Sequence, residues 1–244
     1  MCRMVGVVFR NEFPIESLND LRDVARHGMI PGEPDPGHND GWGIVSFRNG
    51  TPLYVGRSSR PIFNDESYES ALCDVPKLEV PNILVAHARA LSNGAATIPN
   101  THPFVMDGIV LCHNGTVKNI KFKSRHQVKG ETDTEKLLAR LADKVEDGDD
   151  LGRSVKQLIK EDIHSNEYTA AILFISDGKK LYAYRDFSIG KSPVYYDLKM
   201  AVCDDHIAFF QETRSGYRGK LYQIEDKELV TVDLDLNVQR EMLL

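Results

Sequence analysis

The sequence predicts an α+β protein in which two antiparallel sheets pack together and the helices form a separate layer. Strand-sized apolar segments come first, helical segments follow, and further strand-sized segments fill the last third of the chain. Two antiparallel sheets accommodate this order most simply. A chain of 244 residues with 41% hydrophobic residues can bury a large core, as one sizeable domain or two small ones.

The first half of the chain starts with a β-branched run at residues 4–9, which predicts a buried strand with Cys2 at its edge. A helix is predicted over 15–25, because apolar residues recur at helical spacing between a proline and a glycine. Three prolines and two glycines predict a loop over 29–39. Further strands are predicted over 41–47, 52–56, 82–90 and 108–112.

The second half is predicted to begin with two helices. Polar residues at 132–135 precede apolar residues at helical spacing, which predicts a capped helix, and a second helix is predicted over 151–163. Turns such as Asp177-Gly178 separate the segments that follow. Strands are predicted over 168–176, 179–185, 193–197, 206–211, 218–224 and 227–234.

Charge and composition exclude several classes of protein. The 30 basic and 36 acidic residues are interspersed and give a formal charge of −6, so no nucleic-acid partner is expected. The apolar runs are shorter than a membrane span, and the N-terminus lacks the pattern of a signal peptide, so we expect a cytoplasmic protein without a membrane partner. The four cysteines show no CxxC pair and no zinc spacing, so we expect free thiols and no zinc site. The polar motifs of the chain imply no metal and no cofactor, because a covalent intermediate and water are sufficient for the chemistry they predict. The small buried role typical of cysteine is expected for Cys73, Cys112 and Cys203.

Cys2 differs from the other cysteines because of its position. Removal of Met1 would give this residue a free α-amine beside its thiol. The ordinary pKa of an α-amine, about 7.7–8.0, is close to the roughly 8.5 of a thiol, so the amine can take the thiol proton near neutral pH. A nucleophile and its base would then share one residue, although many chains begin with Met-Cys without any chemical reason.

Three polar segments supply candidate partners for a nucleophile. Asn114 and Gly115 follow a predicted strand, and an amide N–H of each suits an oxyanion hole, although an ordinary Asn-Gly turn is the commoner explanation of such a pair taken alone. Arg89 leaves another strand on the same face as His87; it could bind a carboxylate or form a surface ion pair. The acidic residues within 131–135 could hold an ammonium group, and a capping box also explains them.

Together, these segments resemble the class II glutamine amidotransferase domain of the N-terminal-nucleophile hydrolases. The resemblance spans at least residues 2–140, with a fainter match in the hairpin at 185–193. The matching blocks, in order, are Cys2, Arg89 to Gly94, Asn100 to Phe104, His113-Asn114-Gly115 and Thr132 to Glu135.

The resemblance implies a four-layer αββα sandwich of two antiparallel sheets, formed by residues 2–244 as a single domain of this family. It implies that Cys2 attacks the amide carbon of glutamine and forms a thioester. The oxyanion would be stabilised by Asn114 and Gly115. The remaining site residues are implied to bind the substrate: Arg89, Ser92 and Asn93 its α-carboxylate, and Asp133 its α-ammonium group. The segment Asp40-Gly41-Trp42-Gly43 resembles one found in stand-alone members and is expected to shape a loop behind the nucleophile.

Two departures from the family pattern leave the substrate open. Ala90 replaces the family's tryptophan and Asn93 its histidine, and the segment 210–213 receives no role. Three functions remain: a glutaminase that supplies ammonia to a separate synthase subunit, a stand-alone hydrolase of γ-glutamyl amides or peptides, and a regulatory homologue without activity.

Overall fold

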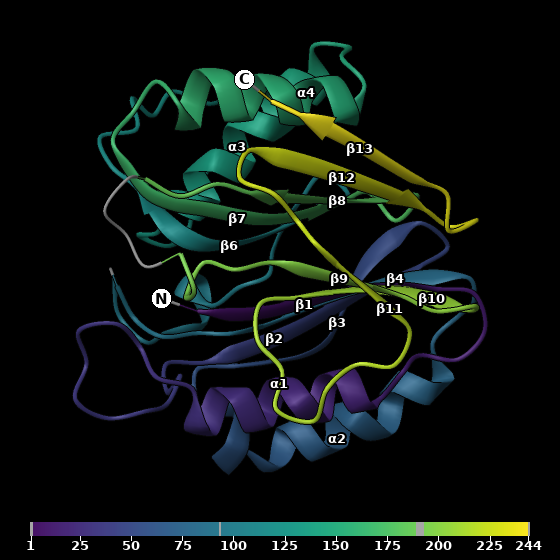
Figure 1. Cartoon of the computed structure of the whole chain (residues 1–244). Helices are drawn as coiled ribbons and strands as arrows, with labels where there is room; N and C mark the ends of the chain where they lie inside the picture. Colours follow the sequence, from purple (N-terminus) through teal and green to yellow (C-terminus); the bar gives the residue numbers. More distant parts are fainter. Residues whose placement is uncertain (1, 93, 189–192, 244) are drawn as a thin grey trace.

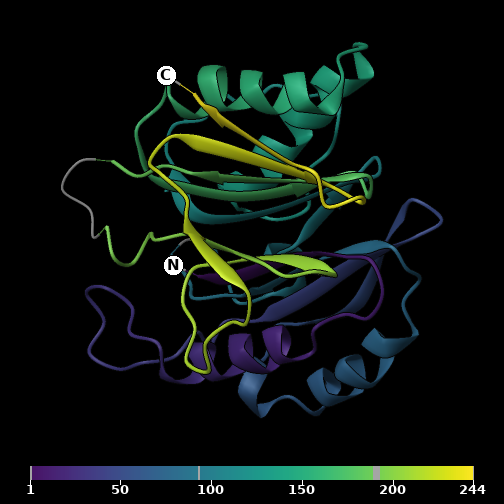
Figure 2. The ribbon, with the colours of Figure 1, turned by 45° about the vertical axis from the view of Figure 1, so that its right-hand side comes forward.

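The computed structural model describes residues 2–92, 94–188 and 193–243. Two antiparallel sheets lie face to face, and helices cover the outer face of each sheet (Figures 1 and 2). The result is a four-layer αββα sandwich, so the predicted fold class is confirmed.

The first sheet has seven strands, and β1 lies near its middle. In spatial order its strands are β11 (Lys220–Gln223), β9 (Lys199–Val202), β10 (His206–Phe210), β1 (Arg3–Phe9), β4 (Asn82–Ala88), β2 (Trp42–Arg48) and β3 (Thr51–Ser58). Helices α1 (Glu16–His27) and α2 (Glu66–Asp74) cover its outer face (Figure 1).

The second sheet has six strands. In spatial order they are β13 (Val238–Met242), β12 (Glu228–Asp233), β8 (Lys180–Arg185), β7 (Tyr168–Ser176), β6 (Ile109–Val117) and β5 (Phe104–Met106). Helices α3 (Asp133–Glu146) and α4 (Leu151–Gln157), the latter continued by a π-helical turn at Leu158–Ile163, cover its outer face (Figure 2).

Side chains alternate along the strands between the layer that separates the two sheets and the layers under the helices. In β1, Met4 and Val8 pack between the sheets, whereas Val5 and Val7 pack under α1. By the same alternation Cys2 belongs to the side between the sheets. A buried apolar core therefore surrounds the N-terminal residue that the sequence singles out.

Three predictions about elements were wrong or incomplete. Residues 193–196 form turns instead of a strand, and the next strand begins only at Lys199. The segment His113-Asn114-Gly115 lies inside β6 instead of following it. Helix α2 and the strands β5 and β13 were not predicted; α2 is a polar segment capped by Asp65, whose side chain accepts a hydrogen bond from the Ser67 backbone.

Within the described ranges, no helix combines the length and the apolar character needed to cross a membrane.

Candidate functional site

Cys2 lies at the start of β1, between the two sheets, and is 7% exposed. Its backbone nitrogen donates a hydrogen bond of 2.9 Å to Oδ1 of Asn114. Its Sγ lies 3.7 Å from the carbonyl oxygen of Ala90. Because β1 and β6 belong to different sheets, the contact with Asn114 crosses the space between them. Met1 lies outside the described residues.

Asn114 and Gly115 are held by the pairing of β6 with β7, opposite Ile172 and Ala171. Asn114 lies on the same side of β6 as Cys112, which packs between the sheets. His113 points the other way, toward α3, where its Nδ1 lies 3.1 Å from Oγ1 of Thr134. The ladder hence directs the asparagine toward Cys2 and the histidine toward the helix.

Gly115 lies at an irregularity of this ladder, where the register shifts between Gly115 and Val117. Its φ of +149° is rarely adopted by other residues, and a Cβ atom here would lie 1.9 Å from the carbonyl oxygen of Ala170. The conformation therefore requires glycine.

Arg89 is 3% exposed and donates from Nη1 to the carbonyl oxygen of Ala95 at 2.9 Å. Asp40 and Gly41 hold its backbone: the Asp40 nitrogen donates to the Arg89 oxygen at 3.0 Å, and the Arg89 nitrogen donates to the Gly41 oxygen at 2.8 Å. The Asp40 carboxylate also accepts from the Leu91 nitrogen at 2.7 Å. Burial lowers the pKa of Arg89, while Cys2 and Asp40 act in the opposite direction. The Asp40-Gly41 segment therefore fixes the arginine and the chain beyond it.

The two glycines at 41 and 43 allow a second loop to approach β2 closely. A Cβ atom on Gly43 would lie 2.4 Å from the carbonyl oxygen of His102, and one on Gly41 would lie 2.9 Å from Oγ1 of Thr101. The same loop contains Asn100, whose Oδ1 accepts from the Glu131 nitrogen at 2.8 Å. The loop at 100–103 therefore lies against the start of β2 on one side and is joined to Glu131, just before α3, on the other.

Asp133 is the first residue of α3, and its carboxylate is already bound by backbone groups. Oδ2 accepts from the Val117 nitrogen at 2.6 Å, and Oδ1 accepts from the Thr134 nitrogen at 3.0 Å. The helix cap is Thr132, whose Oγ1 accepts from the Glu135 nitrogen at 3.2 Å. Asp133 thus ties α3 to the end of β6, and 17% of its side chain remains exposed.

The two other predicted substrate-binding residues lie beyond Arg89. Ser92 is exposed. Asn93 lies outside the described residues, as do residues 189–192 of the hairpin at 185–193. The structure accordingly brings Cys2 into direct contact with Asn114 and with the segment that follows Arg89, and joins Asp133 to β6 by its backbone contacts.

Sequence reasoning missed a second set of residues around Cys2. Arg3 is 4% exposed, and its Nη1 donates to the Cys2 carbonyl oxygen at 3.2 Å. Its Nη2 and Nε donate to Oε2 of Glu212 at 2.8 and 3.0 Å. The guanidinium carbon lies 3.9 Å from the centre of the Tyr195 ring. Gln211 accepts from Nδ2 of Asn114 at 3.2 Å. The segment 210–213, which the sequence analysis left without a role, therefore supplies two of these contacts.

Buried histidines lie close to this site. The rings of His87 and His102 are stacked with centres 4.3 Å apart. Burial, and secondarily the charge of Arg89, lowers the pKa of His87 to about 3. Burial, followed by the neighbouring charge of Arg3, also lowers the pKa of His38 to about 3. These imidazoles are neutral at physiological pH.

The remaining cysteines differ from one another. Cys112 is fully buried between the sheets, and burial raises its pKa well above the ordinary value. The prediction of a small buried residue is therefore confirmed for Cys112. It was wrong for Cys73, which is exposed, and Cys203 is only partly buried.

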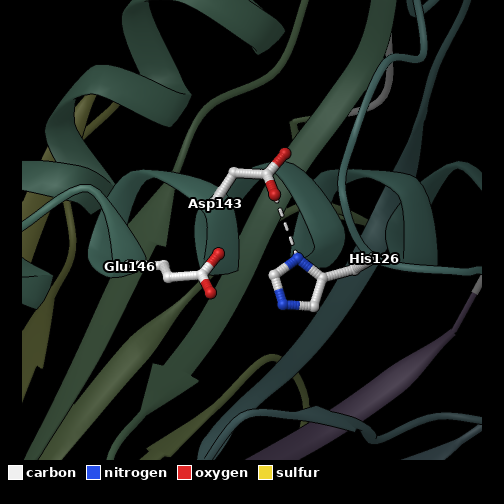
Figure 3. Close-up of side chains that lie close together, drawn as sticks. All are labelled: His126, Asp143 and Glu146. Atoms are coloured by element: carbon white, nitrogen blue, oxygen red, sulfur yellow. Dashed lines mark hydrogen bonds and ion pairs between the residues drawn. The ribbon is translucent and has the colours of Figure 1, made fainter.

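One cluster outside this site has a composition that could bind a metal. His126, Asp143 and Glu146 have ligand atoms within 4.8 Å of one another, and Figure 3 shows the imidazole facing two carboxylates of α3. Arg125 already binds these carboxylates, with Nε 3.3 Å from Asp143 and 3.0 Å from Glu146. The positive charge of Arg125 therefore balances the cluster, and we assign it no metal.

Two relatives found by sequence comparison are longer than this chain and match it over part of their length. An uncharacterized protein of Methanocaldococcus jannaschii is 27% identical in an alignment of 202 positions, which covers 77% of this chain and 51% of the relative. The glutamine–fructose-6-phosphate aminotransferase (isomerizing) of Streptococcus pyogenes serotype M6 is 30% identical over 163 residues, 62% of this chain and 25% of the enzyme. The chain therefore spans between a quarter and about half of the length of these relatives.

Solved structures share the fold at low sequence identity. The glutamine phosphoribosylpyrophosphate amidotransferase from B. subtilis has a TM-score of 0.63 at 14% identity, covering 100% of this chain and 49% of the enzyme. A glutamine aminotransferase class-II domain protein from Silicibacter pomeroyi has a TM-score of 0.63 at 15% identity, covering 98% of this chain and 99% of that one. The family model described as "Glutamine amidotransferases class-II" matches residues 1–215. The chain therefore belongs to the class-II glutamine amidotransferases.

Proposed function

We propose that this chain hydrolyses the side-chain amide of glutamine through a thioester on Cys2, as a glutaminase formed by residues 2–244 acting as one catalytic domain. The observation that carries the proposal is the hydrogen bond from the Cys2 nitrogen to Asn114 across the two sheets, 2.9 Å long. It joins the proposed nucleophile and its own base to one member of the proposed oxyanion hole.

The reaction starts with transfer of the thiol proton to the α-amine of Cys2, which is free only after Met1 has been removed. The thiolate attacks the amide carbon, and the negative charge that develops on oxygen is stabilised by N–H groups of Asn114 and Gly115. The α-ammonium then returns its proton to the leaving nitrogen, which departs as ammonia. Water hydrolyses the thioester to glutamate and restores the thiol.

The amino-acid end of glutamine is proposed to bind one cation and one anion. Arg89 pairs with the α-carboxylate, together with Ser92 and Asn93, and Asp133 accepts from the α-ammonium group. A carboxylate has about four acceptor positions, so the two backbone contacts of Asp133 leave capacity for the substrate. The tight hold of Asp40 and Gly41 on the Arg89 backbone supports a positioning of this kind.

The fate of the ammonia defines two forms of the proposal. Transfer to a separate synthase subunit is supported by the similarity to an aminotransferase of which this chain spans 25%. Cleavage of a γ-glutamyl amide or peptide needs no ammonia acceptor. Ala90 is smaller than the family's tryptophan at this position, which favours a substrate other than glutamine.

The test measures ammonia release from glutamine and amine release from a γ-glutamyl peptide by the purified chain. We expect turnover by the wild type, loss of at least about 1,000-fold with Cys2→Ala, and near wild-type rates with the matched control Cys112→Ala. Arg89→Lys should raise KM about 10- to 100-fold, because lysine cannot form the bidentate hydrogen bonds by which arginine binds a carboxylate.

Fast cleavage of the peptide alone selects the hydrolase form, whereas slow glutamine turnover that rises with a co-purifying protein selects the subunit form. Activity that persists in Cys2→Ala would refute the nucleophile. Intact-mass measurement of the protein from its native host provides an independent check, since a retained Met1 is incompatible with the α-amine mechanism.

A further inference from the structure

Gln211 follows strand β10, and the register of that strand directs its side chain between the two sheets. Phe210 pairs with Val5 of β1 and packs under α1, whereas Phe209 packs between the sheets. Alternation therefore places Gln211 on the same side as Phe209, which agrees with its exposure of 4% and its contact with Asn114.

Two hydrogen bonds connect Gln211 with the proposed nucleophile. The Cys2 nitrogen donates to Oδ1 of Asn114 at 2.9 Å, and Nδ2 of Asn114 donates to Oε1 of Gln211 at 3.2 Å. The first bond requires the oxygen end of the asparagine amide to face Cys2. Oε1 of Gln211 favours the same orientation, because it accepts a hydrogen bond from Nδ2 and so keeps the nitrogen end of the Asn114 amide turned away from Cys2.

The orientation of the Asn114 amide has direct consequences for the chemistry. If the amide turned over, Nδ2 would donate to the α-amine of Cys2 and occupy the lone pair that must take the thiol proton. In the observed orientation, Oδ1 accepts an N–H of the amine and leaves that lone pair available. One of the two Nδ2 hydrogens is used by Gln211, and the other remains for the oxyanion.

We propose that Gln211 is a positioning residue, which holds the Asn114 carboxamide with its oxygen on the Cys2 nitrogen and one N–H directed toward the oxyanion. This inference rests on the proposed function of Cys2. The adjacent residue supports it, since Glu212 holds Arg3, whose Nη1 donates to the Cys2 carbonyl oxygen at 3.2 Å. Residues 211 and 212 therefore fix Cys2 from both its nitrogen and its carbonyl side.

A role in stability alone does not explain this glutamine. Its Nε2 is buried and has no hydrogen-bond partner among the residues that the structure describes. An unpaired buried donor costs about 1–3 kcal/mol, a cost that an apolar residue of similar size would avoid. Gln211→Met removes this unpaired donor but leaves Nδ2 of Asn114 without its acceptor, so the two costs offset and the urea midpoint should stay about unchanged.

The experiment compares wild type, Gln211→Met, Gln211→Glu, which keeps an acceptor, and Gln239→Met, which removes an amide from the exposed strand β13. With glutamine, we expect kcat of Gln211→Met to fall about 10- to 100-fold while KM stays within about two-fold. Gln211→Glu should remain within about three-fold of wild type, and Gln239→Met should be unchanged.

A second measurement does not require turnover. Carbamidomethylation of Cys2 by iodoacetamide at pH 7, followed by peptide mass spectrometry, reports how readily the thiol ionises. In Gln211→Met the Asn114 amide can turn over, and the α-amine then loses Oδ1 as a hydrogen-bond acceptor, which lowers the pKa of the amine. A weaker base takes the thiol proton less readily, so alkylation of Cys2 should slow about three-fold or more. If the wild type releases no ammonia, the proposed function fails while this measurement still tests Gln211.

The positioning role is overturned if Gln211→Met keeps the wild-type kcat and the wild-type alkylation rate. It is also overturned if Gln211→Glu is folded but as slow as Gln211→Met. Should Gln211→Met not fold, Gln211→Glu alone decides: both rates near wild type support the role, and a loss of either refutes it.

Discussion

Acid should destabilise this protein through its buried histidines, and His87 allows the effect to be measured on one residue. Its side chain is 0% exposed and its ring is stacked on His102 at 4.3 Å. Burial, followed by the charge of Arg89, lowers its pKa from 6.5 to about 3. The unfolded chain therefore binds a proton on this residue below about pH 6.5, and the folded protein binds it only near pH 3. The stability that depends on the neutral ring is complete above pH 6.5 and is lost as pH falls from 6.5 toward 3.

The size of the effect follows from the width of this interval. Each pH unit below 6.5 removes about 1.4 kcal/mol from the free energy of unfolding per histidine, so His87 contributes a loss of about 2 kcal/mol at pH 5. His38, whose pKa is also lowered to about 3, adds a loss of similar size. His102 acts in the same direction, because burial holds its pKa well below the ordinary value.

Urea unfolding followed by circular dichroism at pH 7.5, 6 and 5 measures this dependence. The loss of unfolding free energy between pH 7.5 and pH 5 should be about 2 kcal/mol smaller for His87→Phe than for the wild type. His126→Gln is the matched control. Partial burial lowers the pKa of His126, but ion pairs with Asp107 and Asp143 outweigh it and raise the pKa overall, so its contribution is present below pH 6.5 and is lost as pH rises. Equal losses in the wild type and in His87→Phe would refute the reasoning.

Two further predictions concern residues that hold the site. Arg3→Met should lower the free energy of unfolding by about 2 kcal/mol in urea titrations, because it leaves Glu212 without its partner. The loss is smaller than for a fully buried pair, since about a third of the Glu212 side chain is exposed. Adding Glu212→Gln should recover part of the loss, and strictly additive effects of the two substitutions would contradict the pairing. Gly115→Ala should lower the free energy of unfolding by at least about 3 kcal/mol and abolish ammonia release. The control Gly108→Ala also has a positive φ, but a Cβ atom there meets open space, so thermal unfolding should show a loss of only about 1–2 kcal/mol. Equal losses would argue against a clash with Ala170.

The elements predicted well are those whose signals are local. Helix α3 begins where Thr132 caps it, and α1 ends where the Gly28 nitrogen donates to the Val24 oxygen at 2.7 Å. The prediction of a strand over 193–197 was wrong because it relied on aromatic residues, which are typical of strands. Tyr195 and Tyr196 are instead buried in a turn, because their rings pack in the core between the sheets, and their carbonyl oxygens accept from the buried arginines Arg3 and Arg185.

The site was predictable in part. Cys2 and Asn114, which are in contact, were assigned to one site by family resemblance and not by local pattern, and their joint role in catalysis stays a prediction. Gln211 and Arg3 could not be found in this way, because their roles depend on the pairing of β10 with β1 across about 200 residues of sequence. The location of Asn114 inside β6 was missed since an Asn-Gly pair usually indicates a turn, whereas here the glycine forms an irregularity within a ladder.

The position of Cys2 on one sheet and Asn114 on the other makes the reaction proposed here sensitive to the thickness of the core. Gly6 of β1 faces that core, and a Cβ atom there would lie 3.1 Å from Leu181 and 3.3 Å from Phe174 of the opposite sheet. Side chains far from Cys2 thus set how closely the two halves of the site approach. Under the proposed mechanism, a substitution that thickens the core, such as Gly6→Ala, should therefore slow amide cleavage without altering any residue that touches the substrate.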